Sequence, residues 1–208
     1  MKHYFYWTLA VLTTISVTII TSCDKPENNP EDESSIIVDP TETGDSILLH
    51  ANFDNAIPAT WKNLDQDGDG NKWLLFSDVF GHDFMNGYCN TDCAISSSKN
   101  ELHPDNWLIS PQFHIPGSGG YKLQFYIGSL DANRFEENYS VYVGKIKNGV
   151  FEQQGTLGTG TTQGSFLQYI EYSLEAYKGH DICIAFRHHN TTEMSFLLLD
   201  EVQISLAE

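Results

Sequence analysis

The chain has 208 residues, with 28 acidic side chains against 11 basic ones and a formal net charge of −17. This length fits one medium domain plus a tail, and a surface this acidic would repel a phosphate backbone, which argues against DNA or RNA as a partner. About 40% of the residues are hydrophobic and 12% are aromatic, so the chain can bury an ordinary core and is not wholly disordered.

The first 22 residues have the pattern of an export signal. Lys2 and His3 precede an apolar run at residues 4–20, which has about the length of a signal-peptide core. The run ends in small residues directly before Cys23, and this arrangement resembles a bacterial lipobox, in which the cysteine is acylated and becomes the mature N-terminus. We therefore expect residues 1–22 to be a lipoprotein signal peptide and Cys23 to carry lipid. A plain secretory signal and an uncleaved anchor are the alternatives.

Residues 23–45 are predicted to be an acidic, disordered linker. Residues 24–45 contain eight acidic side chains against one lysine, which gives a charge of −7, and a stretch this polar cannot offset its ordering entropy. The acidic cluster after the cysteine resembles the export signal of surface lipoproteins in Bacteroidetes, although a solubilising spacer explains it equally well. We expect a location on the outer membrane, facing the exterior, with membrane contact only through the lipid.

From residue 46 to residue 208 the apolar period is two, and turn residues recur about every ten positions, which predicts one all-β domain. The segments expected as strands are 47–53, 72–77, 92–98, 107–115, 121–129, 139–147, 150–157, 166–173, 181–189 and 195–206. Asn148-Gly149 predicts a tight hairpin, because this pair supplies the positive φ angles of such a turn. Ten short strands predict a β-sandwich of two antiparallel sheets.

Several landmarks follow one another in an order that resembles the cleaved-adhesin (choice-of-anchor J) family. They are ANFD at 51–54, Ile57-Pro58, Trp61, DQDGDGNKW at 65–73, DNWLISP at 105–111 and LDEVQI at 199–204. The resemblance implies a jelly-roll module, related in shape to galactose-binding-like and MAM domains, that is non-catalytic and often stabilised by calcium. Asp54 departs from the family pattern, in which Glu is commoner, and the Cys89–Cys93 loop has no counterpart in it.

Asp200 has the same parity in its predicted strand as Leu198 and Val202, which are expected to face the core. A carboxylate turned inward is costly unless a cation or several donors meet it. Asp54, at the end of the first predicted strand, is a plausible second oxygen ligand if the first and last strands are neighbours. The pair predicts a structural Ca²⁺ site, and the alternative is a bulge that turns Asp200 towards solvent or capping by backbone N–H groups.

A second predicted calcium site is a loop with acids on alternate residues. Asp65, Asp67 and Asp69 are followed by Gly70 and Asn71, which copies the first half of an EF-hand loop. The second half does not match, because Phe76 stands where a bidentate Glu belongs, so an EF-hand is excluded and a calcium site in a β-loop is expected. A plain acidic turn is the alternative.

Cys89 and Cys93 are four residues apart in a polar loop of an exported chain, which favours a short-loop disulfide. Zinc binding with His82 and His103 is a weaker alternative, because no second pair of ligands has the expected spacing. Cys183 alternates with isoleucines and is expected to be buried.

No nucleophile elbow, zinc-protease motif or phosphate-binding loop is present in the sequence. The neighbouring acids Glu136-Glu137 and Asp200-Glu201 point to opposite faces of a strand and cannot flank one glycosidic bond. The sequence therefore predicts that the chain is not an enzyme.

The remaining prediction is a surface adhesin-like module that binds a glycan or an extracellular protein. A sugar site stacks an aromatic ring on the sugar and directs polar groups to its hydroxyls. The candidate ligand-binding residues, all in predicted loops, are Tyr88, Asn86, Asp83, His82, Arg134 and Asn133. The alternative from another class is a structural lipoprotein that assembles with protein partners and binds no sugar, and a glycoside hydrolase or peptidase accessory is less favoured.

Overall fold

The structure is a computed structural model that describes residues 35–37, 47–84, 89 and 91–207. The described residues belong to one compact unit that spans Asp32–Glu208. The predicted signal peptide, Cys23 and most of the predicted linker lie outside the described residues. Within the part of the chain that is described, no helix has the length and hydrophobicity needed to cross a bilayer.

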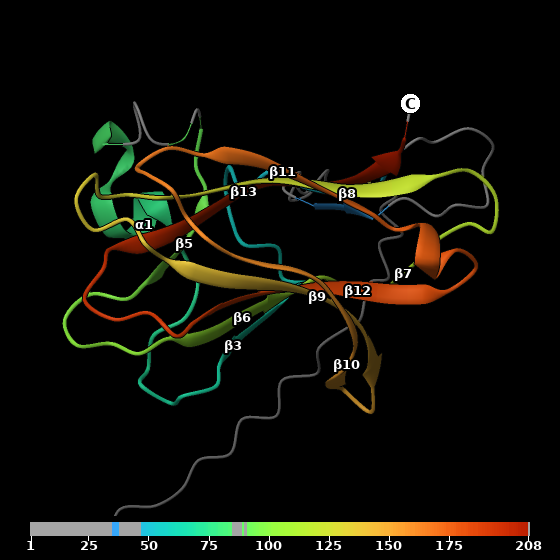
Figure 1. Ribbon diagram of the computed structural model, residues 1–208, viewed down its shortest axis with the longest axis horizontal. Helices are drawn as coiled ribbons and strands as arrows, with labels where there is room; N and C mark the ends of the chain where they lie inside the picture. Colours follow the sequence, from blue (N-terminus) through green and yellow to red (C-terminus); the bar gives the residue numbers. More distant parts are fainter. Residues whose placement is uncertain (1–34, 38–46, 85–88, 90, 208) are drawn as a thin grey trace, which may run out of the picture. The chain divides into compact units, whose positions relative to one another are not determined.

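The described strands form two antiparallel sheets that lie in two layers (Figure 1), and the fold is the predicted jelly-roll β-sandwich. The first, here called the β13 sheet, contains β1 (Ser35–Ile37), β2 (Ile47–Ala51), β4 (Leu74–Leu75), β5 (Ala94–Ser97), β8 (Tyr121–Ser129), β11 (Gln168–Ser173) and β13 (Phe196–Leu206). The second, the β12 sheet, contains β3 (Lys62–Asp65), β6 (Asp105–Ile109), β7 (Phe113–His114), β9 (Asn138–Lys147), β10 (Val150–Thr161) and β12 (Asp181–His189).

The last strand organises the first sheet. Along one side β13 pairs with β8, and along the other it pairs first with β5 and then with β2, with Val202 opposite Ala51. The first and last strands of the predicted domain are therefore neighbours, which is the arrangement that the Asp54–Asp200 hypothesis requires.

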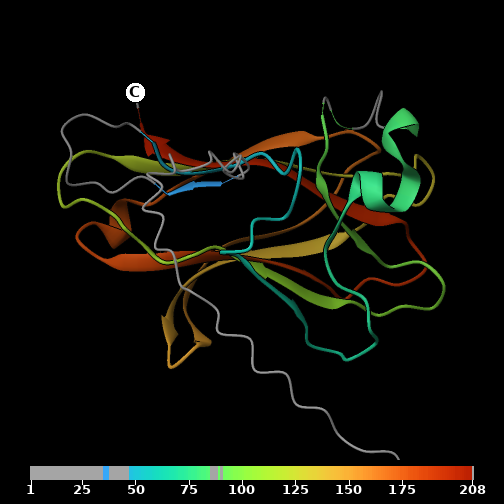
Figure 2. The same ribbon diagram turned by 180° about the vertical axis from the view of Figure 1, so that it is seen from behind.

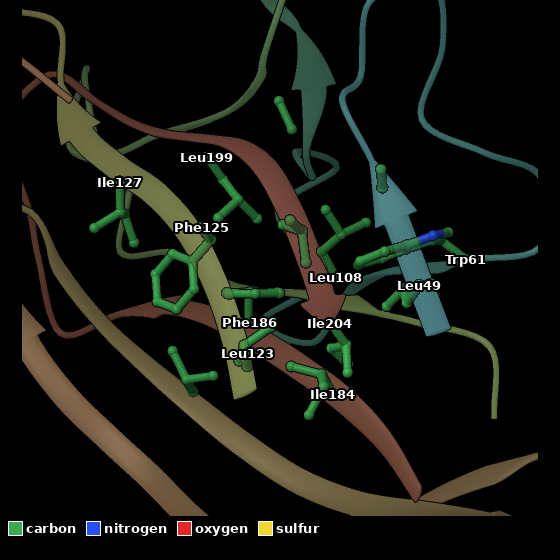
Figure 3. Packing of buried hydrophobic residues seen from close by; sticks show 14 of the residues in the cluster. Leu49, Trp61, Leu108, Leu123, Phe125, Ile127, Ile184, Phe186, Leu199 and Ile204 are labelled. Atoms are coloured by element: carbon green, nitrogen blue, oxygen red, sulfur yellow. The ribbon is translucent and has the colours of Figure 1, made fainter. Parts of the chain in front are cut away.

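The core lies between the two sheets, where buried side chains from both sheets meet (Figure 3). Phe125 of β8 and Phe186 of β12 meet edge to face, with ring centroids 5.0 Å apart. Both side chains are buried, and burial of a side chain of this size contributes about 1.5–3 kcal/mol relative to exposure. The period of two in the sequence therefore reflects one face of each sheet turned towards this core.

The structure departs from the predicted strands where local packing overrides the alternation. The segment 72–77 was expected to be one strand, but β4 ends at Leu75 and helix α1 (Phe76–Phe80) follows. Phe76, the first residue of this helix, is buried. Short 3-10 helices occur at His82–Phe84 (η1) and Glu175–Tyr177 (η2). The expected strand 107–115 is divided into β6 and β7, because Pro111 has no N–H to donate to a ladder.

Part of the predicted linker is not a free tether. Ser35–Ile37 form β1, which pairs antiparallel with β2 in register Ile36 to His50. The short apolar run 36–38 explains this difference, because it is the one part of the linker that suits a strand.

The predicted hairpin is confirmed, since Asn148 and Gly149 both have positive φ and join β9 to β10. The backbone of Gly128 in β8 lies very close to the backbone of Phe166, just before β11. A Cβ atom there would lie 2.2 Å from the carbonyl oxygen of Phe166, whereas a Cβ on Gly117 would meet nothing within 4 Å.

We expect Gly128→Ala to lower the free energy of unfolding by about 1–3 kcal/mol, because the backbone before β11 must move to admit the methyl group. Urea unfolding measures the loss, with Gly117→Ala as the matched control. Equal stability of the two variants would contradict the close approach.

Candidate functional site

A recess of about 640 Å³ opens on the outer side of the β13 sheet, and we call it the tyrosine recess. Its described lining residues come from β8, β11, β13 and the segments beside them: Thr91, Gln124, Tyr126, Leu167, Tyr169, Asp200, Glu201 and Gln203. The three strands lie side by side in one layer in both ribbon views (Figures 1 and 2). The recess therefore has a rigid floor of paired strands.

Two exposed aromatic rings stand in this recess. Tyr126 and Tyr169 are 40% and 48% exposed, and their rings meet edge to face with centroids 5.6 Å apart. Gln124 donates to the Tyr169 hydroxyl, which in turn donates to Glu171 at 2.8 Å. Since β11 pairs with β8 so that Tyr169 lies opposite Tyr126, the strand register itself holds the pair together.

Asp200 reaches the recess because β13 contains a bulge. The register with β8 shifts between Asp200 and Gln203, and Glu201 adopts a positive φ of 49°. Before the bulge Leu197 and Leu199 face the main core, and after it Val202 and Ile204 do. The prediction that Asp200 points into that core with Leu198 and Val202 is therefore wrong, because the extra residue changes the parity. Leu198 packs instead in a second cluster with Phe76 and Cys93.

The Asp200 side chain is nevertheless only 4% exposed. Its Oδ1 accepts a hydrogen bond from the backbone N–H of Glu201 at 2.8 Å. Burial raises the pKa of the Asp200 carboxyl to about 8, and the negative charges of Glu201, Asp54 and Asp92 act in the same direction. The carboxylate thus lies in a place that favours a proton or a cation beside it.

Asp54 supplies a second unusual carboxylate near Asp200. Its Oδ2 accepts a hydrogen bond from the side-chain amide of Asn52 at 2.6 Å. Its Oδ1 is buried and has no hydrogen-bond partner among the described residues. A buried carboxylate oxygen without a donor suits a hard cation, so the donor set fits Ca²⁺.

The predicted loop of alternate acids forms a tight turn. Asp65, Asp67 and Asp69 can bring one oxygen each within 4.8 Å of the others. The backbone N–H groups of Gly70 and Gly68 donate to Asp65, and the first of these bonds is the main reason that its pKa is lowered. Burial, followed by the hydrogen bond with Asp65, raises the pKa of Asp67.

Asn71 donates its backbone and side-chain N–H groups to Asp69 at 2.7 and 3.1 Å. The amide nitrogen of Asn71 therefore faces the acidic group, where the sequence hypothesis required an oxygen ligand. The turn is largely exposed, and the hydrogen bonds within it hold its shape.

Cys89 and Cys93 form a disulfide, with Cα atoms 6.3 Å apart. Thr91, between them, lines the tyrosine recess. Asp92 accepts hydrogen bonds from the backbone N–H groups of Ser77 and Cys93, at 3.1 and 2.9 Å. The crosslinked loop thus forms one wall of the recess.

The other predicted ligand-binding residues do not gather at this place. His82 and Asp83 are exposed on η1, and the N–H groups of Asn133 and Arg134 donate to Asp131 in an exposed turn. None of these four lines the tyrosine recess. Asn86 and Tyr88 lie outside the described residues.

Sequence reasoning missed Tyr126 and Tyr169. The signal was present in the alternation of β8, where Lys122, Gln124 and Tyr126 share the outward parity. An aromatic residue on the polar face of a strand is the feature that marks it.

A chain of serine, histidine and glutamate lies inside the sandwich. Ser96 Oγ is 2.8 Å from His188 Nδ1, and His188 Nε2 is 3.0 Å from Glu137 Oε2. All three residues are at most 1% exposed, so a substrate cannot reach the Ser96 hydroxyl. Ser96 belongs to β5 and His188 to β12, and the chain therefore ties the two sheets together.

Comparison with known proteins gives a consistent family. A family model for the Cleaved Adhesin Domain matches residues 46–204. The chain is 32% identical over 177 residues to Hemagglutinin A of Porphyromonas gingivalis, covering 76% of this chain and 7% of that protein. It is 32% identical over 179 residues to Gingipain R1 of the same species, covering 76% of this chain and 10% of the relative. The chain therefore spans a tenth or less of these curated relatives.

Solved structures show the same fold. The K1 Cleaved Adhesin domain of Lys-gingipain from P. gingivalis W83 superposes with a TM-score of 0.61 at 29% identity, covering 76% of this chain and 98% of that one. The CBM22-1 xylan-binding domain from Paenibacillus barcinonensis has a TM-score of 0.52 at 13% identity, covering 80% of this chain and 98% of that one. At this identity the second match shows the fold alone.

Proposed function

Since the chain belongs to the Cleaved Adhesin family, we propose that it is a non-catalytic binding module that holds a glycan in the tyrosine recess. One observation carries the proposal: two exposed tyrosine rings stand in a single recess beside amide, hydroxyl and carboxyl groups. Aromatic faces pack on the apolar face of a sugar ring, while such polar groups orient its hydroxyls. The predicted lipid at Cys23 would place the module on the outer membrane, facing the exterior.

We propose no catalytic activity because of where the titratable side chains lie. Ser96, His188 and Glu137 are closed off from solvent. Glu136 and Glu137 point to opposite sides, one exposed and the other buried, so they cannot act together on one bond. A binding role is the interpretation that fits both the recess and the buried groups.

Calcium enters the proposal at Asp54 and Asp200, whose buried oxygens suit a hard cation. An ion there would offset the cost of burying two carboxylates and would join β13 to the segment after β2. The turn of Asp65, Asp67 and Asp69 is a second, more exposed place where Ca²⁺ would bind. In this proposal the ion is structural and takes no part in chemistry.

Replacing either recess tyrosine tests the binding proposal. We expect Tyr126→Ala and Tyr169→Ala each to weaken glycan binding at least tenfold, about 1.4 kcal/mol, with little change in the unfolding midpoint, because both rings are half exposed. A glycan array on residues 24–208, which keep β1 and omit the predicted signal peptide and Cys23, identifies a ligand, and calorimetry measures its Kd.

The control is Val150→Ala, which removes an exposed apolar side chain from the other sheet. Binding that survives both tyrosine replacements would place the sugar elsewhere, and no binding to any glycan would reject the proposal.

The second candidate function is assembly with an extracellular protein without sugar binding. A hollow of about 450 Å³ on the outer side of the β12 sheet favours it, lined in part by Trp107, Phe151 and Val150. Val150 is 65% exposed there. Loss of partner binding on Val150→Asp, with glycan binding absent, would support this candidate over the first.

A further inference from the structure

The charged groups of the tyrosine recess are of one sign. Asp200 and Glu201 line it, and its described lining contains no lysine, arginine or histidine. Basic groups at the margin are already paired with acids, His50 with Glu201 at 2.8 Å and Lys122 with Glu171 at 2.9 Å. A ligand entering the recess therefore meets two acidic side chains and no basic side chain in the described lining, while His50, at the margin, is held by Glu201.

The other polar groups of the recess are uncharged. Gln124 is held in place, because its Oε1 accepts from Ser205 Oγ at 2.9 Å while its amide nitrogen donates to Tyr169. Gln203 and the Thr91 hydroxyl add further donors and acceptors. Amides and hydroxyls pair well with sugar hydroxyls, whereas carboxylate and sulfate groups are recognised by Arg and Lys.

From these two observations we propose that the recess selects neutral saccharides and rejects acidic ones, with Glu201 as the specificity-determining residue. This inference rests on the proposed function of the same site. Glu201 has the larger influence on an incoming anion, because its side chain is 46% exposed while Asp200 is almost completely buried. The positive φ of Glu201 at the bulge fixes where its side chain leaves the strand.

The test compares matched pairs of oligosaccharides, each neutral chain beside the same chain carrying a sialic acid, a uronic acid or a sulfate. Measurements are made at low ionic strength, first with calcium and then in EDTA, because added salt and a bound divalent cation both reduce the field of the recess while the proposed ion is also structural. We expect every acidic member to bind at least tenfold more weakly than its neutral partner. Acidic members that bind as tightly as neutral ones would overturn the inference.

Glu201→Gln gives a second, independent readout. It should narrow the ratio between neutral and acidic affinities at least threefold. The matched control is Glu152→Gln, which removes the same charge from the exposed β9–β10 hairpin on the other sheet, and it should leave the ratio unchanged.

If Glu201→Gln and Glu152→Gln narrow the ratio of neutral to acidic affinities equally, Glu201 has no local role and the selectivity comes from the net charge of the protein. Failure of the proposed function looks different, because then neither member of any pair binds.

Discussion

Replacing Glu137 with alanine is expected to lower the free energy of unfolding by about 3–5 kcal/mol, because it removes the shared acceptor of a buried hydrogen-bond network. Glu137 is completely buried, although it lies in the segment just before β9. Its carboxylate accepts hydrogen bonds from the backbone N–H of Ser195 at 2.6 Å and from the Ser98 hydroxyl at 2.9 Å. His188 is the third partner, at 3.0 Å.

The loss is large because the partners cannot turn to water. Ser98, Ser195 and His188 are themselves completely buried, so truncation of Glu137 leaves several donors without an acceptor inside the sandwich. Partners come from both sheets, since β5 ends next to Ser98, β13 begins after Ser195, and His188 belongs to β12. One deletion therefore weakens the connection between the layers.

Urea unfolding measures the effect, and Glu136→Ala is the matched control because its side chain is exposed. The control should change stability by no more than about 0.5 kcal/mol. Glu137→Gln keeps the shape but replaces one acceptor oxygen with a donor, so it should fall between the two. Similar stability of Glu136→Ala and Glu137→Ala would show that the buried chain contributes little to the fold.

The strands could be predicted from the sequence where one face meets the core along the whole element. The expected bounds 121–129 and 181–189 coincide with β8 and β12, because both strands are central: β8 alternates over its first six residues, and β12 carries a continuous buried run from Ile182 to Phe186. The prediction was weakest for short strands at the edges of the sheets. β3 was not expected, since its four residues are all only partly buried, and alternation alone does not mark such a strand.

The recess could not be predicted as a site, although its parts were visible. Tyr126 lies on the outward face of β8, and Tyr169 is brought opposite to it by a pairing between two strands that are distant in the sequence. Local pattern gives the face of a residue but not its neighbour across the sheet. The bulge at Glu201 is a further case: one residue with positive φ reverses the parity of everything before it, and no local sequence rule required it.

Asp200→Asn is expected to raise stability in EDTA and at the same time to abolish stabilisation by calcium. In the folded protein the pKa of Asp200 is about 8, against an ordinary value of 3.8. The folded state therefore holds this proton more tightly than the unfolded state. The resulting stability is fully present below about pH 4 and is lost as the pH rises through about 8.

Without calcium, the wild-type protein should thus lose stability between about pH 4 and pH 9, on the order of a few kcal/mol. The asparagine side chain of the variant has no proton to lose and is nearly the same size, so the variant should show a flatter dependence and exceed the wild type at about pH 8.5. Thermal unfolding in EDTA across this range measures both curves. A steeper fall in the variant would contradict the burial of an unpaired carboxylate.

With calcium the order should reverse. An ion bound only to the folded state stabilises it by about 2.7 kcal/mol at a concentration 100-fold above its Kd, and Asp200→Asn removes a charged ligand from the proposed Asp54–Asp200 site. Asp65→Asn tests the exposed turn separately, and Asp78→Asn, on the exposed face of α1, controls for charge. If Asp200→Asn is still fully stabilised by calcium and Asp65→Asn is not, the calcium site is the turn of Asp65, Asp67 and Asp69. If calcium stabilisation is lost only in Asp200→Asn, one cation connects β13 to the segment after β2 that contains Asp54.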